Sequence, residues 1–398
     1  MLAAVLGIGQ ILSWGTLCFG FPLIALGMEA ELDWSKSEIY LGVTISMVMT
    51  AVFSFPVGLR IDRGQGRWIL TGASLLILPV LSWWAVTSNL VAFYVISAFS
   101  GVLQAALLYE PAFAVLARRV GASQARAGIT QITLWGGFAS TVSVPLVAAL
   151  IAWSDWRTTL IILGVINALY AIVYFVSIHP DRDVEQATDN TMRQTHAARD
   201  RQIVQQNLRR SAFWMLLLSL TFYAGNFSGL AYHMYPLLES KGLSATDVVI
   251  IMALIGPAQV LGRILVTWLA ADRSLSQIGV VLACMFPIVF MFFYPAQVNF
   301  WVMAALCVTY GLVNGTFTIV RSLMVPELLS PHAYGALNGI ITVSGTLARA
   351  AVPLAAAWVW SWQMSYQPVV LLLTGLSVLM MVTFCLAVWQ ARRSPYMD

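Results

Sequence analysis

Apolar stretches about twenty residues long, separated by short polar connections, run along almost the whole chain. A bilayer core about 30 Å thick needs roughly 20 apolar residues per helix, so each stretch predicts a membrane-spanning helix. The expected spans are residues 2–27, 40–59, 68–87, 90–116, 128–152, 158–178, 212–237, 248–270, 276–295, 299–325, 336–360 and 367–391. The pattern predicts an all-α membrane protein with twelve transmembrane helices.

One long polar segment interrupts this pattern at residues 179–210, where six arginines mix with five acidic residues. Such a composition suits a linker that lies in part as an amphipathic helix at the membrane interface. The expected organisation is an N-terminal six-helix bundle at 1–178, a cytoplasmic linker at 179–210 and a C-terminal six-helix bundle at 211–398.

The two predicted bundles share residues at a nearly constant spacing. Gly101 and Gly311 are 210 residues apart, and so are the pairs Asp62-Arg63 and Asp272-Arg273. Parallel six-helix repeats place a substrate site near the membrane midplane, between the two halves.

Composition and charge agree with a membrane location. The chain is 60% hydrophobic and only 10% charged, whereas soluble chains carry about 25% charged residues. Of 21 Lys and Arg residues, 15 fall on the side of the termini and linker, and three, Lys36, Arg157 and Lys241, fall on the opposite side. By the positive-inside rule both termini are cytoplasmic, and we expect a multi-pass protein of a bacterial inner (plasma) membrane.

A resemblance to a known family starts at Gly58-Leu-Arg-Ile-Asp62-Arg63-Gly64-Gln65-Gly66-Arg67. This segment resembles the loop between helices 2 and 3 of major facilitator superfamily transporters, with one extra residue before Arg67. The resemblance implies the twelve-helix fold of that superfamily and a gating role for Asp62, Arg63 and Arg67, and the repeat extends this role to Asp272 and Arg273. The alternative is that these arginines only orient the chain in the membrane.

Further motifs are most similar to the monocarboxylate and oxalate/formate group. They are Tyr109-Glu-Pro-Ala-Phe, Asp155-Trp-Arg157, Gly262-Arg263 and Val325-Pro-Glu-Leu. The acidic-Gly-aromatic signature of that group is absent around the first helix. The Gly-Pro-x-x-Gly-Gly pattern of drug/proton antiporters is absent from the fifth span. The likeness implies a small organic anion, such as a carboxylate, as substrate.

Four charged side chains fall inside otherwise apolar spans: Glu110, Arg263, Arg321 and Arg349. A charge at mid-bilayer costs roughly 2.5–3.5 kcal/mol on insertion scales, which favours a functional role. The resemblance implies that Arg263 binds the substrate carboxylate and that Arg349 is a second anion anchor. Arg263 could instead pair with Glu110 or a backbone carbonyl, and Arg349 could be a structural charge.

The remaining candidates concern coupling and the cavity. Glu110 is either a proton carrier or a fixed counter-ion, and Arg321 is either a gate or a residue that snorkels to the interface. His233 is a proton relay, an outer-gate group or part of an interfacial aromatic belt. The candidate cavity-lining residues are Gln10, Trp14, Tyr109, Gln131, Asn226 and Asn314.

No catalytic constellation, phosphate-binding loop or metal-ligand spacing occurs in the sequence. We therefore expect no enzyme and no cofactor, but a monomeric secondary carrier that moves a small anion by alternating access. The expected partners are that solute, a proton or other coupling ion, and the bilayer, not nucleic acid. The alternatives are efflux of a drug, siderophore or other amphiphile, a non-transporting sensor or partner-binding subunit, and a membrane enzyme.

Overall fold

A computed structural model describes residues 2–179, 183, 203–269, 274–295, 299–330 and 334–393. The predicted gate residues Asp272 and Arg273 lie outside the described residues, as does most of the predicted linker. The part of the linker described next to the second bundle is helical at residues 203–208.

The first half of the chain forms a continuous series of helices. They are α1 (Leu2–Trp14), the π-helical turn η1 (Gly15–Phe19), α2 (Phe21–Leu32), α3 (Lys36–Arg60), the π-helical turn η2 (Ile61–Gln65), α4 (Gly66–Val86), α5 (Leu90–Leu107), α6 (Tyr109–Val120), α7 (Ala122–Gly137), α8 (Ala139–Trp153) and α9 (Trp156–Ser177). The second half contains α11 (Ser211–Glu239), α12 (Ala245–Leu269), α13 (Leu275–Phe292), α14 (Phe300–Leu328), α15 (Tyr334–Gln363) and α16 (Gln367–Arg393).

Eleven continuous helical runs among the described residues are long and apolar enough to cross a membrane. The longest, Lys36–Val86, contains two of the predicted spans, and it turns at Gly64, where φ is 83°. A side chain at this φ would be strained, and glycine avoids that cost. The described chain thus provides twelve candidate crossings, and the predicted fold class is confirmed.

Large apolar side chains cover the outside of these helices, as a lipid solvent requires. Phe55 is 74% exposed and Trp301 is 77% exposed. In water such surface would be costly, because burying apolar area is worth about 25 cal/mol per Å².

Several helices extend beyond the predicted spans. α2 continues to Leu32 rather than ending at residue 27, and α3 begins at Lys36 rather than at residue 40. Polar capping explains the second difference. The Ser35 side chain accepts a hydrogen bond from the Glu38 backbone N–H, and the Glu38 carboxylate accepts one from the Ser35 N–H at 2.8 Å. This reciprocal cap stabilises a helix start that a count of apolar residues misses.

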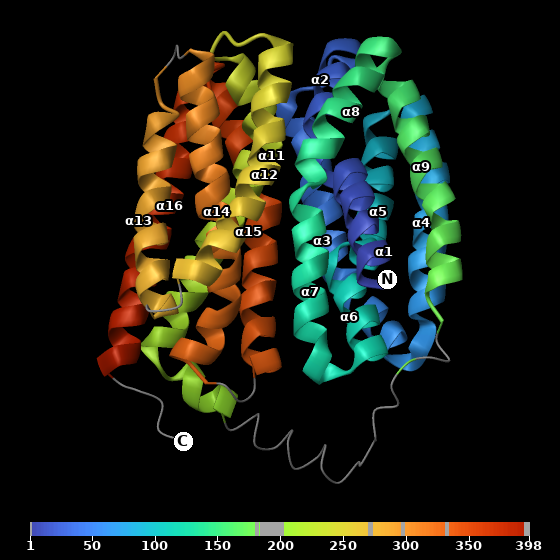
Figure 1. Cartoon of the computed structure of the whole chain (residues 1–398). Helices are drawn as coiled ribbons and strands as arrows, with labels where there is room; N and C mark the ends of the chain where they lie inside the picture. Colours follow the sequence, from blue (N-terminus) through green and yellow to red (C-terminus); the bar gives the residue numbers. More distant parts are fainter. Residues whose placement is uncertain are drawn as a thin grey trace.

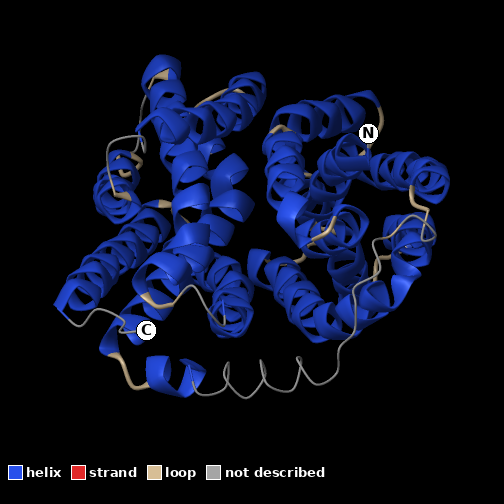
Figure 2. Cartoon of the chain, turned by 60° about the horizontal axis from the view of Figure 1, so that its bottom comes forward, coloured by secondary structure: helices blue, strands red, loops and turns tan. Residues whose placement is uncertain are grey.

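The helices form two bundles that stand side by side, α1–α9 in one and α11–α16 in the other (Figure 1). Figure 2 views the same two groups with the bottom of Figure 1 turned forward. We call the end where α9 stops and α11 starts the linker end. The opposite end, which carries the short connections at 33–35, 87–89 and 154–155, is the far end.

The repeat predicted from glycines corresponds to equivalent helix contacts. A Cβ atom at Gly101 of α5 would lie 2.1 Å from the Ser46 carbonyl oxygen in α3. At Gly311 of α14 it would lie 2.9 Å from the Ile255 carbonyl oxygen in α12. Each half therefore uses a glycine to bring the same pair of its helices into backbone contact.

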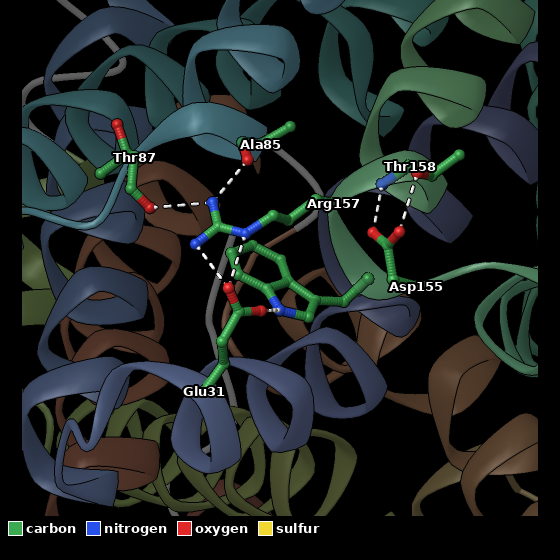
Figure 3. Close-up of polar contacts among 7 residues, drawn as sticks. Glu31, Ala85, Thr87, Asp155, Arg157 and Thr158 are labelled. Atoms are coloured by element: carbon green, nitrogen blue, oxygen red, sulfur yellow. Dashed lines mark hydrogen bonds and ion pairs between the residues drawn. The ribbon is translucent and has the colours of Figure 1, made fainter.

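A polar network fastens the far end of the first bundle (Figure 3). The Arg157 guanidinium donates to Glu31 at 3.0 Å and to the carbonyl oxygens of Ala85 and Thr87 at 2.5 and 3.2 Å. The Trp156 indole N–H donates to the same Glu31 carboxylate at 2.6 Å. These bonds tie the ends of α2, α4 and α9 together.

Asp155 begins α9 beside this network. Its carboxylate accepts a hydrogen bond from the Thr158 backbone N–H at 2.8 Å, which is an N-cap. This backbone N–H holds the pKa of the Asp155 carboxyl below its usual range. The Asp155-Trp-Arg157 motif thus has a structural role in the described chain.

The glycine contacts predict a matched pair of stability effects. Gly101→Ala should lower the free energy of unfolding by about 1–3 kcal/mol, because the new methyl group meets a backbone carbonyl that cannot rotate away. Gly72→Ala, with no atom within 4 Å of its Cβ position, should instead stabilise α4 by about 0.5–1 kcal/mol. Thermal unfolding of the two purified variants in detergent tests both. Equal midpoints would contradict the close contact at Gly101.

Candidate functional site: the interface between the two bundles

An aromatic cluster closes the interface between the bundles towards the far end. The imidazole of His233 stacks on the Tyr40 ring, with the ring centroids 4.3 Å apart, and the Tyr40 hydroxyl donates to the Tyr232 carbonyl oxygen at 2.7 Å. His233 is fully buried, and its Nδ1 lies 3.5 Å from the Tyr366 hydroxyl. We call Tyr40, Tyr232, His233 and Tyr366 the far gate.

The hydrogen bonds of His233 constrain its tautomer. Its Nε2 lies 2.9 Å from the Pro353 carbonyl oxygen, which can only accept. Nε2 therefore carries the proton in the neutral ring, and Nδ1 is left to accept from Tyr366. The structure thus places His233 between the bundles and not in a belt at the membrane surface.

A small cavity with several polar groups in a largely apolar wall lies beside this gate in the first bundle. Its volume is about 20 Å³, and Ser46, Ser100, Gln104 and Tyr232 are among its lining residues. The Gln104 amide donates to the Ser46 hydroxyl at 2.9 Å. A space of this size and polarity suits a single water molecule.

Hydrogen bonds between described residues of the two halves continue from the far gate towards the middle of the helices. Thr44 donates to the Ala350 carbonyl oxygen at 2.7 Å, and Thr141 donates to the Ala253 carbonyl oxygen at 2.9 Å. Nearest the linker end, the Arg263 guanidinium donates to the Thr133 carbonyl oxygen.

The helix break at Leu108 positions the centre of the site. Leu108 has φ −74° and ψ −160°, so α5 ends and α6 starts at Tyr109. The break leaves carbonyl groups without helical partners, and the buried Gln10 amide donates to those of Leu107 and Leu108 at 2.9 and 3.3 Å. The predicted cavity residue Gln10 therefore has a structural role, because its amide stabilises the helix break.

The break also brings Tyr109 into an aromatic group at the interface. Its ring centroid lies 5.3 Å from that of Trp14 and 5.3 Å from that of Phe113. A Cβ atom at Gly136 would lie 2.1 Å from the Tyr109 hydroxyl. The absence of a side chain at Gly136 therefore leaves room for this hydroxyl.

The four intramembrane charges converge around Tyr109. Its hydroxyl group lies within electrostatic range of all of them, namely Glu110, Arg263, Arg321 and Arg349. They come from four helices, α6, α12, α14 and α15, and from both bundles. The ion pairs among described residues join Lys36 to Glu29, Arg118 and Arg119 to Asp183, and Arg157 to Glu31, so none includes these four charges.

Aromatic rings and one carbonyl group stand beside the three arginines. The Arg321 guanidinium lies 5.6 Å from the Tyr223 ring centroid, and that of Arg349 lies 5.7 Å from the Phe227 ring centroid. Such contacts stabilise a cation without neutralising it. Arg263 is buried against the Thr133 carbonyl, and its Nε atom has no partner among the described residues. The carbonyl alternative for Arg263 is therefore realised here, and the pairing with Glu110 is not.

The other predicted cavity residues lie in different environments: two are buried within the second bundle, and one is exposed. Asn226 donates to the Leu373 carbonyl oxygen at 3.1 Å, and Asn314 accepts from the Tyr223 hydroxyl at 2.8 Å, so both buried amides join helices within the second bundle. Gln131 is exposed on α7.

The predicted gate residues at the linker end make their described contacts within the first bundle. Asp62 and Arg63 are exposed, and the Asp62 carbonyl oxygen accepts a hydrogen bond from Arg118. The Arg67 guanidinium lies 3.7 Å from the Phe175 ring centroid. Their role in gating stays a prediction.

Sequence reasoning named His233 as a candidate outer-gate group but missed the three tyrosines of the far gate and the partners of the arginines. Tyr40, Tyr223, Phe227 and Thr133 are ordinary helical residues in a chain with 13 tyrosines and 19 phenylalanines. The spacing of aromatic residues along the sequence does not show which rings face the other bundle and which face lipid. No group of three or more potential metal ligands occurs among the described residues.

Two repeated helical bundles with uncompensated charges at their interface define a two-bundle membrane transporter. The chain belongs to the Major Facilitator Superfamily, whose family model matches residues 5–353. Members of this superfamily are membrane transporters of small molecules and not enzymes.

The chain is similar to proteins of known class. Monocarboxylate transporter 12 of Mus musculus is 23% identical over 295 residues, which cover 67% of this chain and 60% of that relative's length. A bacterial homologue of the human lysosomal transporter Spinster, solved inward-facing and unoccupied, has a TM-score of 0.73 at 13% identity and covers 98% of this chain and 95% of its own. The nucleoside transporter NupG has a TM-score of 0.72 at 13% identity, with 97% and 98% covered. These structures show the fold.

The far gate predicts how a buried thiol reacts. Cys18 is buried and lies against Tyr232, so a water-soluble maleimide added at the far side should reach it slowly. Tyr40→Phe removes one hydrogen bond, worth about 0.5–1.5 kcal/mol, and should speed labelling up to about tenfold. Tyr40→Ala also removes the stack on His233 and should speed it more.

Cys18→Ser, carried in the same backgrounds, measures labelling of the other cysteines. Labelling rates that do not differ between the wild type and Tyr40→Ala would show that Tyr40 does not seal the interface.

Proposed function

We propose that this transporter moves a small organic anion, with a carboxylate as its charged group, by proton-coupled alternating access. The observation that carries the proposal is the convergence of three arginines and one glutamate around Tyr109, without an ion pair to any of them among the described residues. Such a cluster carries an excess of positive charge, which favours an anionic guest.

The chemistry of the cluster supports a carboxylate in particular. A guanidinium offers parallel N–H groups that match the two oxygens of a carboxylate. In the structure the Arg263 guanidinium donates one hydrogen bond to a backbone carbonyl oxygen. Its buried Nε–H has no acceptor among the described residues. A substrate carboxylate would offer a charged acceptor in exchange. Arg349 would be the second anchor, and the mouse relative named a monocarboxylate transporter agrees with this class.

Substrate binding would then drive the alternation of access. The described bonds between the halves lie from the far gate to the level of Arg263. With both termini in the cytoplasm, as the distribution of arginines predicts, this conformation is closed to the outside. Closure of the linker end without a bound anion would bury the unpaired charges of the arginines. The energetic cost of burying these charges opposes closure. A bound anion removes that penalty.

Proton coupling is assigned to Glu110 and His233. Glu110 is exposed next to Tyr109 and lies in the same charge cluster as the arginines. His233 occupies the far gate and is fully buried, so a second proton would place a cation there without water to solvate it, and this would disfavour the closed gate. Protonation of the two groups at different stages would link proton movement to the two gates.

Efflux of an amphiphile is the second candidate. The observation in its favour is the aromatic group of Trp14, Phe19, Tyr109 and Phe113 at the interface. Competition of transport by hydrophobic cations, and not by carboxylates, would support it.

Removal of an arginine predicts loss of carboxylate transport. Arg263→Ala and Arg349→Ala should each reduce uptake of radiolabelled lactate or oxalate into proteoliposomes by about tenfold or more, because a hydrogen bond to a charged group is worth about 1.5–3 kcal/mol. Arg60→Ala, which removes an exposed arginine at the linker end of α3, is the matched control. Full uptake by Arg263→Ala would remove that residue from the anion site.

Neutralisation of Glu110 separates its two candidate roles. If Glu110 carries the proton, Glu110→Gln should abolish accumulation driven by a pH gradient and retain exchange of labelled for unlabelled substrate, because exchange needs no net proton movement. If Glu110 is a fixed counter-ion, both activities should fall together. Side-by-side flux measurements in the same liposomes distinguish these results.

A further inference from the structure

The structure contains a second cavity between the bundles, separate from the charge cluster. It lies at the far end and has a volume of about 540 Å³. Leu26, Trp360 and Tyr366 contribute apolar and aromatic walls, and Lys36 and Lys241 contribute cationic groups. We call this space the vestibule. Its volume falls in the range of small-molecule sites, about 300–1,000 Å³.

Lys36 is a buried cation that crosses between the bundles. Only 8% of it is exposed, and its ammonium lies 2.5 Å from the Glu29 carboxylate. The same nitrogen lies 4.5 Å from the ring centroid of Trp360 in the other half. Glu29 compensates this charge, so Lys36 fixes the position of the Trp360 ring in the vestibule wall.

Lys241 is the cation whose charge has no such compensation. Only 5% of it is exposed, and its Nζ donates to the carbonyl oxygens of Pro295 and Tyr294 at 2.5 and 3.4 Å. None of the ion pairs among the described residues includes it. An ammonium has three N–H donors, so one donor has no acceptor among the described residues.

Burial lowers the pKa of the Lys241 ammonium, as expected for a cation that has lost water and gained only neutral acceptors. Glu239 also lines the vestibule but is exposed, so water solvates its carboxylate. The unbalanced buried charge of the vestibule is therefore positive.

We propose that the vestibule is a binding site for an organic anion with an apolar body, whose carboxylate contacts Lys241 and whose body lies against Trp360 and Leu26. Tyr366 lines the vestibule and also contacts His233, so the bound anion lies directly outside the far gate. The assignment of this anion as the transported substrate, waiting to enter, rests on the proposed function. Binding itself does not depend on transport.

Fluorine NMR of 5-fluorotryptophan-labelled protein in phosphatidylcholine nanodiscs tests the site, with benzoate as the probe. The Trp360 resonance is assigned by its loss in Trp360→Phe. We expect benzoate to shift this resonance saturably in the wild type, in Lys241→Arg and in Arg349→Ala, which leaves the vestibule intact. Lys241→Gln should weaken the apparent affinity by about tenfold or more.

Three results would overturn the site: an unmoved Trp360 resonance in the wild type, an equal shift with sodium chloride, or unchanged affinity in Lys241→Gln. The charge-retaining Lys241→Arg shows whether a loss reflects misfolding. A saturable shift of the Trp360 resonance without any carboxylate uptake would contradict the proposed function and still support the vestibule as a binding site. Carboxylate uptake that depends on the arginines, together with a Trp360 resonance that benzoate does not shift, would support the proposed function and contradict the vestibule site.

Discussion

The energetic cost of isolated charges in an apolar protein governs the interface of this transporter. Three guanidinium groups and one carboxylate gather around Tyr109. Glu110 and Arg321 are exposed, whereas Arg263 is buried and loses the solvation that water would give it. The fold meets part of that cost with neutral partners: two aromatic rings of α11 and one backbone carbonyl of α7. Neutral partners stabilise these charges without neutralising them.

The neutral partners also connect the charges to the geometry of the bundles. Tyr223 and Phe227 are four residues apart on α11 and therefore face the same side of that helix, so one helix supports Arg321 and Arg349 together. Arg263 instead reaches across to Thr133 in the other bundle. A change in the separation of the bundles must break this bond, whereas the two ring contacts move with the second bundle. Arg263 is thus the arginine most directly tied to the conformation of the transporter.

The far end is built differently from the centre. There several of the described charges are paired, as in Lys36 with Glu29 and Arg157 with Glu31, and aromatic rings of the two bundles pack against each other beside the vestibule. This end is fastened by many specific contacts, and Lys241 is the buried cation there that keeps an unused donor. The contrast between the ion pairs of this end and the unpaired charges of the described centre agrees with the proposed alternating transport of an anion.

The sequence by itself determined the number and order of the membrane crossings, because the hydrophobic length of a span is a local property. It also singled out Glu110, Arg263, Arg321 and Arg349 as candidate site residues, since these charges stand out against an apolar background. Only the tertiary structure decided which groups those charges meet. A ring at position 223 or 227 and a carbonyl at 133 carry no signal in one dimension, because their partners are brought near by the packing of helices more than 90 residues away in the chain.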